Sequence, residues 1–484
     1  MRDDIDPDGL RLPIKLDATS NGEFVPIPLA PVHRRIRHEA LSDADRAARR
    51  LARSRRDFLI SSCGAASTLL AMNRVYAATG QTGGFYAIDP EAAYEPALAD
   101  AALTGQEFIF DVQGHFVNPE GAWLKPLPEG ARPLSGMAKA GCALADGDGP
   151  RAYLNCLGPD EFIKDVFLDS DTDLVVLSFV PSRSDAEPLT IEEAAATAAI
   201  VEKLEGSHRL LLHGRVNPNQ DGDLARMDEL AERWGVAAWK TYTQWGPNGR
   251  GFFLDDEPGL AFIDKARQLK VPTIAIHKGI PFGRRSYEHS LCDDIGRVAR
   301  RYPDVNFLIY HSGFVPGQAE GPYDPDHNEG IDSLIRSLQI NEVPRNSNVY
   351  AELGSTWRFL MREPDSAAHA LGKLLKYVGQ DNVLWGTDSI WYGSPQDQIQ
   401  AFRSFQISPE LRERHGYPEL TPALRAKVFG LNALKVYPQA AALPGVVDAV
   451  MHQRAAYRQA PQPQFRTYGP KTRREFLALK SWGG

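Results

Sequence analysis

Four short apolar runs in this sequence each end in a histidine or an aspartate. The pairs are residues 107–114 with His115, 271–276 with His277, 306–310 with His311 and 383–387 with Asp388. A single residue of this kind at a strand end is ordinarily a hydrogen-bonded polar group. Core packing does not require four of them at matching positions, whereas metal and acid–base chemistry do.

Three imidazoles and a carboxylate can serve as ligands of a divalent metal, which takes three or four nitrogen or oxygen donors and keeps one position open. Such a metal brings the pKa of a bound water near 7 and polarises a substrate oxygen. Asp388 suits two roles here, as a ligand and as the acceptor of the proton that the water gives up.

The elements that must position these residues are short strands that alternate with helices. Strands are predicted over residues 108–112, 174–179, 210–216, 236–240, 271–276, 307–310, 349–353 and 383–385. They are apolar and mostly do not alternate, which is typical of strands buried on both faces. Eight such strands, alternating with helices, predict a closed parallel (β/α)8 barrel. The alternative is an open doubly wound sheet, which normally carries a Gly-rich turn where this chain has Gln113-Gly114-His115.

In such a barrel the carboxyl ends of the strands ring one mouth, so the four residues would meet there. Two long loops, 116–170 and 312–330, leave the same strand ends and are expected to cover the site.

Composition narrows the class of protein. The 484 residues are 43% hydrophobic and 24% charged, and no apolar stretch approaches the roughly 20 residues of an integral membrane span. The formal net charge is −8, and the first 78 residues are basic, so the remaining body is acidic. An acidic body argues against nucleic acid as the partner.

The N-terminal region divides into two parts. Residues 1 to about 50 are polar and alternately charged, and we expect them to be largely disordered. Arg55 and Arg56, the Phe-Leu pair and weakly apolar run after them, and the small residues ending at Ala77 resemble a twin-arginine export signal. That resemblance implies the twin-arginine translocon as a partner and a periplasmic location. The alternative is an amphipathic surface helix.

The expected organisation is therefore a leader and signal over 1–78, a linker over 79–106, the barrel over 107–440 and a tail over 441–484. Cys142 and Cys156 fall in one loop-rich segment and could pair in an oxidising compartment; the alternative is buried or free thiols.

Five segments carry a family resemblance: residues 111–116, 162–173, 310–313, 384–388 and 427–433. They resemble the amidohydrolase-related family, in the branch that includes aminocarboxymuconate semialdehyde decarboxylase. The similarity covers roughly residues 107 to 440. It implies a distorted (β/α)8 barrel and an enzyme that is a metal-dependent hydrolase, lactonase, hydratase or non-oxidative decarboxylase.

Carried over by position, the resemblance makes His115, His277 and Asp388 metal ligands and His311 the catalytic base or the group that orients the water. Gln113 departs from the family, which commonly has His, or Glu in some decarboxylases, at this position. Residues i and i+2 of a strand share a face, so Gln113 should lie beside His115 as a weaker ligand. The metal is then bound by three residues, bound loosely, or absent.

Three residues are candidates for binding substrate. Lys240 ends the fourth predicted strand and could hold a substrate carboxylate or pair with a buried acid, and Trp245 follows it in the same loop. Arg284 could clamp an anionic substrate or lie in an exposed basic turn.

We therefore predict a metal-dependent hydrolase in which a metal-activated water attacks the amide, ester or lactone carbonyl of a small carboxylate or aromatic substrate. The expected metal is zinc, with manganese as the alternative. The other hypotheses are a non-oxidative decarboxylase of an aromatic or unsaturated acid, and a metal-free barrel that acts as a binding protein. The oligomeric state is left open, a homo-oligomer included.

Overall fold

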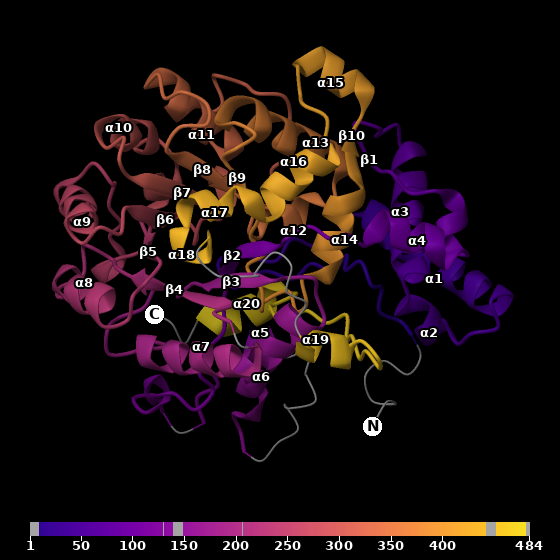
Figure 1. Ribbon diagram of the computed structural model, residues 1–484, viewed down its shortest axis with the longest axis horizontal. Coiled ribbons are helices and arrows are strands. Elements are labelled where there is room, and N and C mark those ends of the chain that lie inside the picture. Colours follow the sequence, from indigo (N-terminus) through magenta and orange to yellow (C-terminus); the bar gives the residue numbers. More distant parts are fainter. Residues whose placement is uncertain (1–8, 129, 139–148, 206, 442–451, 481–484) are drawn as a thin grey trace.

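Eight parallel strands form a barrel at the centre of the molecule (Figure 1). The computed structural model describes residues 9–480 apart from 129, 139–148, 206 and 442–451. The strands pair in chain order: β2 (Phe110–Gly114), β3 (Leu174–Leu177), β4 (Leu210–Arg215), β5 (Ala238–Tyr242), β6 (Thr273–His277), β7 (Asn306–Tyr310), β8 (Val349–Glu352) and β9 (Val383–Leu384). Each overlaps a strand predicted from the sequence.

The barrel closes between its first and last strands. The amide of Val112 donates to the carbonyl of Trp385 at 3.1 Å, and the amide of Asp388 donates to the carbonyl of Gln113 at 2.9 Å. A parallel bridge joins Gly114 to Ser389. The prediction of a (β/α)8 barrel is confirmed.

The strands are apolar on both faces because each face meets a different core. Inward side chains such as Phe110, Val176 and Leu308 fill the barrel interior, and outward ones such as Ile109, Val175 and Phe307 pack beneath the helices. Burial on both faces is the physical reason for the weak alternation in the sequence.

The helices that surround the barrel follow the strands in chain order. The longer ones are α7 (Ile191–Glu205), α8 (Asp223–Glu232), α9 (Glu257–Gln268), α10 (Ile295–Arg301), α11 (Gly330–Ile340), α13 (Pro364–Lys373) and α14 (Gln396–Ser404). The shorter ones are α5 (Ser135–Ala138), α6 (Pro159–Phe162), α12 (Thr356–Leu360), α15 (Pro409–His415), α16 (Pro422–Ala426), α17 (Ala433–Val436) and α18 (Pro438–Ala441).

Residues before the barrel are folded against it. They form α1 (Pro31–Arg50), α2 (Arg55–Leu59), α3 (Ser62–Ala77) and α4 (Pro96–Leu103), which Figure 1 draws in indigo and purple at one side of the barrel. In the predicted linker, β1 (Gly84–Tyr86) pairs antiparallel with β10 (Phe405–Ile407).

The expectation of disorder up to about residue 50 is wrong for α1. Its buried side includes Ile36, Ala40, Ala44 and Ala47, at the three- and four-residue spacing of a helix face. Alanine is only weakly apolar, so this stripe is hidden among the charges of the opposite face. Residues 9–30, called the N-terminal segment below, have no regular structure, yet most of residues 12–21 are buried.

The end of the chain returns to this segment. After the stretch 442–451, α19 (His452–Tyr457) and α20 (Arg473–Lys480) pack onto the body. Thr467 and Thr19 share a hydrogen bond of 2.6 Å, and the amide of Ser20 donates to the carbonyl of Pro470 at 2.8 Å.

The described cysteines comprise one in a disulfide and two free thiols. Cys156 is disulfide-bonded, and Cys142, its predicted partner, lies outside the described residues. Cys63 and Cys292 are free, buried thiols. None of the described helices combines the length and the apolar character that a membrane span requires.

Candidate active site

The four residues predicted at strand ends meet at the carboxyl-terminal mouth of the barrel. His277 ends β6, while His115, His311 and Asp388 lie just after β2, β7 and β9, and all four are buried. They are called the strand-end cluster below. Two close pairs form within it. Nε2 of His311 lies 3.2 Å from Nδ1 of His277, and Nε2 of His115 lies 3.2 Å from Oδ1 of Asp388.

Backbone carbonyls fix the orientation of the first pair. Nε2 of His277 is 3.2 Å from the carbonyl oxygen of Ile280, and Nδ1 of His311 is 2.7 Å from that of Gly354. A carbonyl oxygen only accepts, so both of these nitrogens must carry the hydrogen. A neutral imidazole has one N–H, and the two facing nitrogens therefore both present lone pairs.

Both imidazoles are neutral at physiological pH. Burial lowers the pKa of His311 to about 4, against the opposing charge of Asp388. Burial and the neighbouring His311 hold the pKa of His277 well below its usual range. Two lone pairs at 3.2 Å repel each other, and a cation between them removes that repulsion. The donor chemistry of this pair fits a divalent metal, since metal-bound histidines commonly donate their other N–H to a carbonyl or carboxylate.

Asp388 is surrounded by donors. Its Oδ1 accepts from the side-chain nitrogen Nε2 of Gln113 at 3.1 Å. Its Oδ2 accepts from Nδ2 of Asn21 at 3.0 Å and from the hydroxyl of Ser355. Burial alone would raise the pKa of Asp388, but the hydrogen bond and charge of His115 and the other donors outweigh burial and lower it. Asp388 is therefore an ionised carboxylate at neutral pH, as a proton acceptor must be.

Gln113 lies beside His115 and Asp388, where the shared strand face puts it. Its amide nitrogen is 3.4 Å from Nε2 of His115 and donates to Asp388, while its side-chain oxygen has no hydrogen-bond partner among the described residues. In this arrangement Gln113 acts as a donor to the carboxylate. Its predicted part as a metal ligand stays a prediction, as do those of His115 and Asp388.

Two residues of the cluster hold strained backbone. The φ angle is 59° at Asp388 and 66° at His311, the left-handed region that costs a non-glycine residue of order 1–3 kcal/mol. Buried acids support both turns: Asp111 accepts from the amide and hydroxyl of Thr387, and Glu352 accepts from the amide of His311 at 3.0 Å. Strain of this kind at a cluster of buried polar groups is typical of a functional site.

The N-terminal segment adds two residues to the site that the sequence analysis missed. Asn21 contacts Asp388, and a carboxylate oxygen of Glu23 lies 3.7 Å from Nδ1 of His277. Donor atoms of Glu23, His277 and His311 lie within 4.8 Å of one another, as a shared metal requires. The alternating apolar residues Leu12, Ile14 and Leu16, and the Asn21-Gly22 turn after them, were the signals that could have indicated a packed segment.

Lys240 is the middle residue of β5, two residues before the strand end, where the sequence placed it, and its ammonium lies between Tyr310 and Tyr242. Its ammonium is fully buried and has no hydrogen-bond partner among the described residues, and it lies 3.8 Å from the ring centre of Tyr310. Burial lowers the pKa of Lys240 to about 7, against the opposing charges of Glu23, Glu352 and Asp388. A buried cation without a partner is suited to an anionic substrate group.

The other two substrate candidates lie further out. Trp245 is half-buried in the turn after β5, and Arg284 is exposed in the loop after β6. The described residues give neither side chain a contact with the strand-end cluster, so Arg284 fits its alternative as an exposed basic turn.

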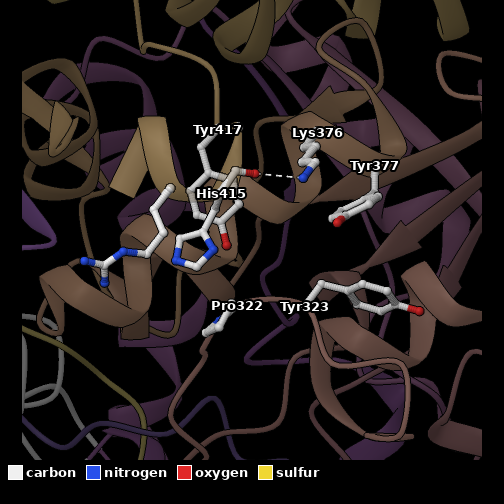
Figure 2. Close-up of a pocket in the computed structure, with 8 residues that line it drawn as sticks. Pro322, Tyr323, Lys376, Tyr377, His415 and Tyr417 are labelled. Carbon is white, nitrogen blue, oxygen red and sulfur yellow. Dashed lines mark hydrogen bonds between the residues drawn. The ribbon is translucent and has the colours of Figure 1, made fainter. Parts of the chain in front are cut away.

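A hollow of about 370 Å³ lies apart from these residues and is drawn in Figure 2. Pro322, Tyr323, Tyr377 and Tyr417 line it with Lys376, whose ammonium donates to the carbonyl of His415 at 2.7 Å. None of its lining residues belongs to the strand-end cluster.

Comparison with known proteins gives several similar solved structures and one family match. No curated protein matches the chain. The solved structures that are similar include 5-carboxyvanillate decarboxylase from Novosphingobium aromaticivorans complexed with manganese, at 15% identity over 70% of this chain and 98% of that chain, with a TM-score of 0.45. They also include 2,6-dihydroxybenzoate decarboxylase from Rhizobium, at 14% identity over 69% and 99% with a TM-score of 0.40. A third is 4-oxalomesaconate hydratase from Rhodopseudomonas palustris, at 16% over 69% and 97% with a TM-score of 0.40.

A family model described as Amidohydrolase matches residues 110–439, the stretch that holds all eight barrel strands and the whole strand-end cluster. The match spans well over half of the chain, which therefore belongs to the amidohydrolase family.

Proposed function

We propose that this protein is a metal-dependent enzyme that hydrolyses an amide, ester or lactone bond of a small carboxylate or aromatic substrate. The observation that supports it most is the pair of facing lone pairs on His277 and His311, 3.2 Å apart in the barrel mouth. Nitrogen and carboxylate donors suit zinc, and manganese is the alternative.

The metal, when bound, supplies Lewis-acid chemistry: it polarises a substrate oxygen and lowers the pKa of water. His277 and His311 would hold it with the two ring nitrogens that face each other. Asp388 accepts the proton of the water that attacks the substrate carbonyl, and it returns that proton to the leaving nitrogen or oxygen when the bond to the carbonyl carbon breaks. His115, at 3.2 Å, keeps the carboxylate of Asp388 oriented. The ammonium of Lys240 binds a carboxylate of the substrate.

The second candidate is non-oxidative decarboxylation of an aromatic or unsaturated carboxylic acid. It is favoured by the dryness of the site, since the strand-end cluster and Lys240 are each at most 2% exposed. Departure of carbon dioxide needs no attacking water. Asp388, ionised at rest, would first accept the proton of the substrate's carboxylic acid group and then give it to the carbon that loses carbon dioxide.

Metal content tests the proposal first. Purified protein should carry about one equivalent of divalent metal, and His277→Ala should lose both metal and activity because it removes a donor of the facing pair. His208→Ala, which changes an exposed histidine paired with Glu202, is the matched control and should keep both. Wild-type protein that binds no divalent metal would instead support the metal-free binding protein.

The reaction class is tested with labelled water. Substrates from both classes are turned over in H₂¹⁸O, and products are examined by mass spectrometry alongside a carbon dioxide assay. Hydrolysis puts one ¹⁸O into the product acid and releases no carbon dioxide. Stoichiometric carbon dioxide without ¹⁸O in the organic product would replace hydrolysis by decarboxylation.

A further inference from the structure

One turn of the N-terminal segment, residues 20–23, lies beside His277 and Asp388 of the strand-end cluster. Gly22 has a φ of 89°, and the amide of Glu23 donates to the side-chain oxygen of Asn21 at 3.0 Å. The amide of Gly22 donates to the hydroxyl of Ser20 at 3.0 Å. These bonds fix the direction in which the Glu23 side chain leaves the turn.

The same turn is hydrogen-bonded to Asp388, the proposed proton acceptor. Nδ2 of Asn21 donates to Asp388 at 3.0 Å and also contacts the carboxylate of Glu23. Its amide therefore holds two carboxylates in fixed relation, one on the barrel and one on the N-terminal segment. The Glu23 side chain is only 19% exposed and points toward His277.

Glu23 completes a set of metal-type donors with the facing histidine pair. Donor atoms of Glu23, His277 and His311 lie within 4.8 Å of one another. A carboxylate oxygen of Glu23 lies 3.7 Å from Nδ1 of His277, the nitrogen that faces Nε2 of His311. Two imidazole nitrogens and a carboxylate oxygen are donors that a divalent metal takes.

We propose that Glu23 is a ligand of the same metal as His277 and His311, so that the N-terminal segment forms one wall of the metal centre. This inference rests on the proposed function only in requiring a bound metal. The side-chain amide of Gln113 donates to Asp388 and carries no negative charge that could bind a metal. Gln113 is thus not an anionic ligand on β2, and Glu23 would supply one from outside the barrel.

The test measures metal affinity with the full chain. Glu23→Gln keeps the shape of the side chain and removes its charge, and Zn²⁺ affinity is measured by competition with a chelator. We expect a loss of about 100-fold or more, because even residues that only support ligands change affinity by about 10–100-fold. Glu39→Gln, in an exposed pair with Arg35, is the matched control and should leave affinity unchanged.

Co²⁺ substitution gives a readout that a purely structural role would not move. The visible absorption of Co²⁺ reports its ligands, so Glu23→Gln should change the spectrum, and Glu23→Asp should also weaken affinity because its carboxylate is one methylene shorter. If Glu23→Gln does not fold, Glu23→Asp carries the test alone. Wild-type affinity and spectrum in the Glu23 variant, together with metal loss in His277→Ala, would overturn the role of Glu23 and leave the proposed function standing. A wild-type protein without metal would overturn both.

Discussion

At the scale of single residues, Lys240 is the residue that we propose binds the carboxylate of the substrate. Its ammonium lies against the faces of Tyr310 and Tyr242, at 3.8 and 4.5 Å from the ring centres, in place of a carboxylate partner. Burial lowers its pKa to about 7, so the charged form is present below pH 7 and is lost as pH rises through that value.

Carboxylate binding should follow this titration. In wild-type protein we expect the Kd of a benzoate-type inhibitor to rise as pH increases from 6 to 8, since Lys240 loses its proton. Lys240→Met should weaken binding about tenfold or more at pH 6 and remove the pH dependence, while metal content stays unchanged. Calorimetric titration at several pH values measures both effects.

Lys240→Arg is the matched control, because a guanidinium keeps its charge throughout this range and should bind with little pH dependence. Equal inhibitor affinity in Lys240→Met and wild type at pH 6 would mean that Lys240 does not contact the substrate carboxylate.

The residues that were predictable share one property: each follows a strand. A buried parallel strand has a strong sequence pattern, and its end fixes where the next side chain lies, so His115, His277, His311 and Asp388 could be brought together from the sequence. Glu23 follows no strand. Its place depends on a turn and on contacts with residues hundreds of positions away, for which one sequence carries no periodic signal.

At the scale of elements, α2 and α3 carry the twin-arginine motif and are also packed into the folded body. Arg55 donates to Asp45 at 3.1 Å, and Arg56 donates to the carbonyl of Pro463 at 3.4 Å. Helix α3 is buried along much of its length, with Leu69 and Met72 fully covered. Cleavage after Ala77 would remove these helices from the folded body, and with them Asn21 and Glu23.

Export through the twin-arginine pathway remains our prediction for Arg55 and Arg56, and it can be separated from their role in the fold. Arg55→Lys with Arg56→Lys keeps both charges, so folding should persist while periplasmic accumulation falls at least about tenfold. Fractionation followed by immunoblotting measures this. Mass spectrometry of the exported protein should find residues 1–77 retained, because the metal centre that we propose includes Glu23.

A second arginine pair near the end of the chain serves as the control for this experiment. Arg473 and Arg474 form a second arginine pair followed by Glu-Phe-Leu, on exposed positions of α20. Replacing both by lysine should leave localisation unchanged. Undiminished periplasmic protein in the Arg55 and Arg56 variant would remove the export hypothesis, and α2 and α3 would then be elements of the fold alone.

At the scale of the whole molecule, the two ends of the chain are joined beside the barrel mouth. Thr467 accepts from Thr19 at 2.6 Å and donates to the carboxylate of Asp17, across a separation of about 450 residues. Arg358 also donates to Asp17 at 2.7 Å and ties this junction to the barrel body. The 441–484 region was predicted as a tail because the chain becomes rich in Ala, Gln and Pro. Its described part instead carries α19 and α20, and the irregular stretch between them is held by side-chain hydrogen bonds and single backbone bonds, which leave no repeat in the sequence.

This junction should couple the C-terminal region to the metal. Thr467→Val keeps the volume of the side chain and removes both hydrogen bonds, which should destabilise the fold by about 1–3 kcal/mol. It leaves every donor atom of the centre in place. Because the segment that carries Glu23 is held less firmly, Zn²⁺ affinity should fall by about tenfold or less, a smaller loss than in Glu23→Gln.

Thr79→Val, which changes an exposed hydroxyl bonded to its own helix, is the control and should alter neither stability nor Zn²⁺ affinity. Thermal melts and chelator competition on the same samples distinguish the two effects: a lower Tm with wild-type Zn²⁺ affinity would mean that the junction stabilises the fold without positioning Glu23.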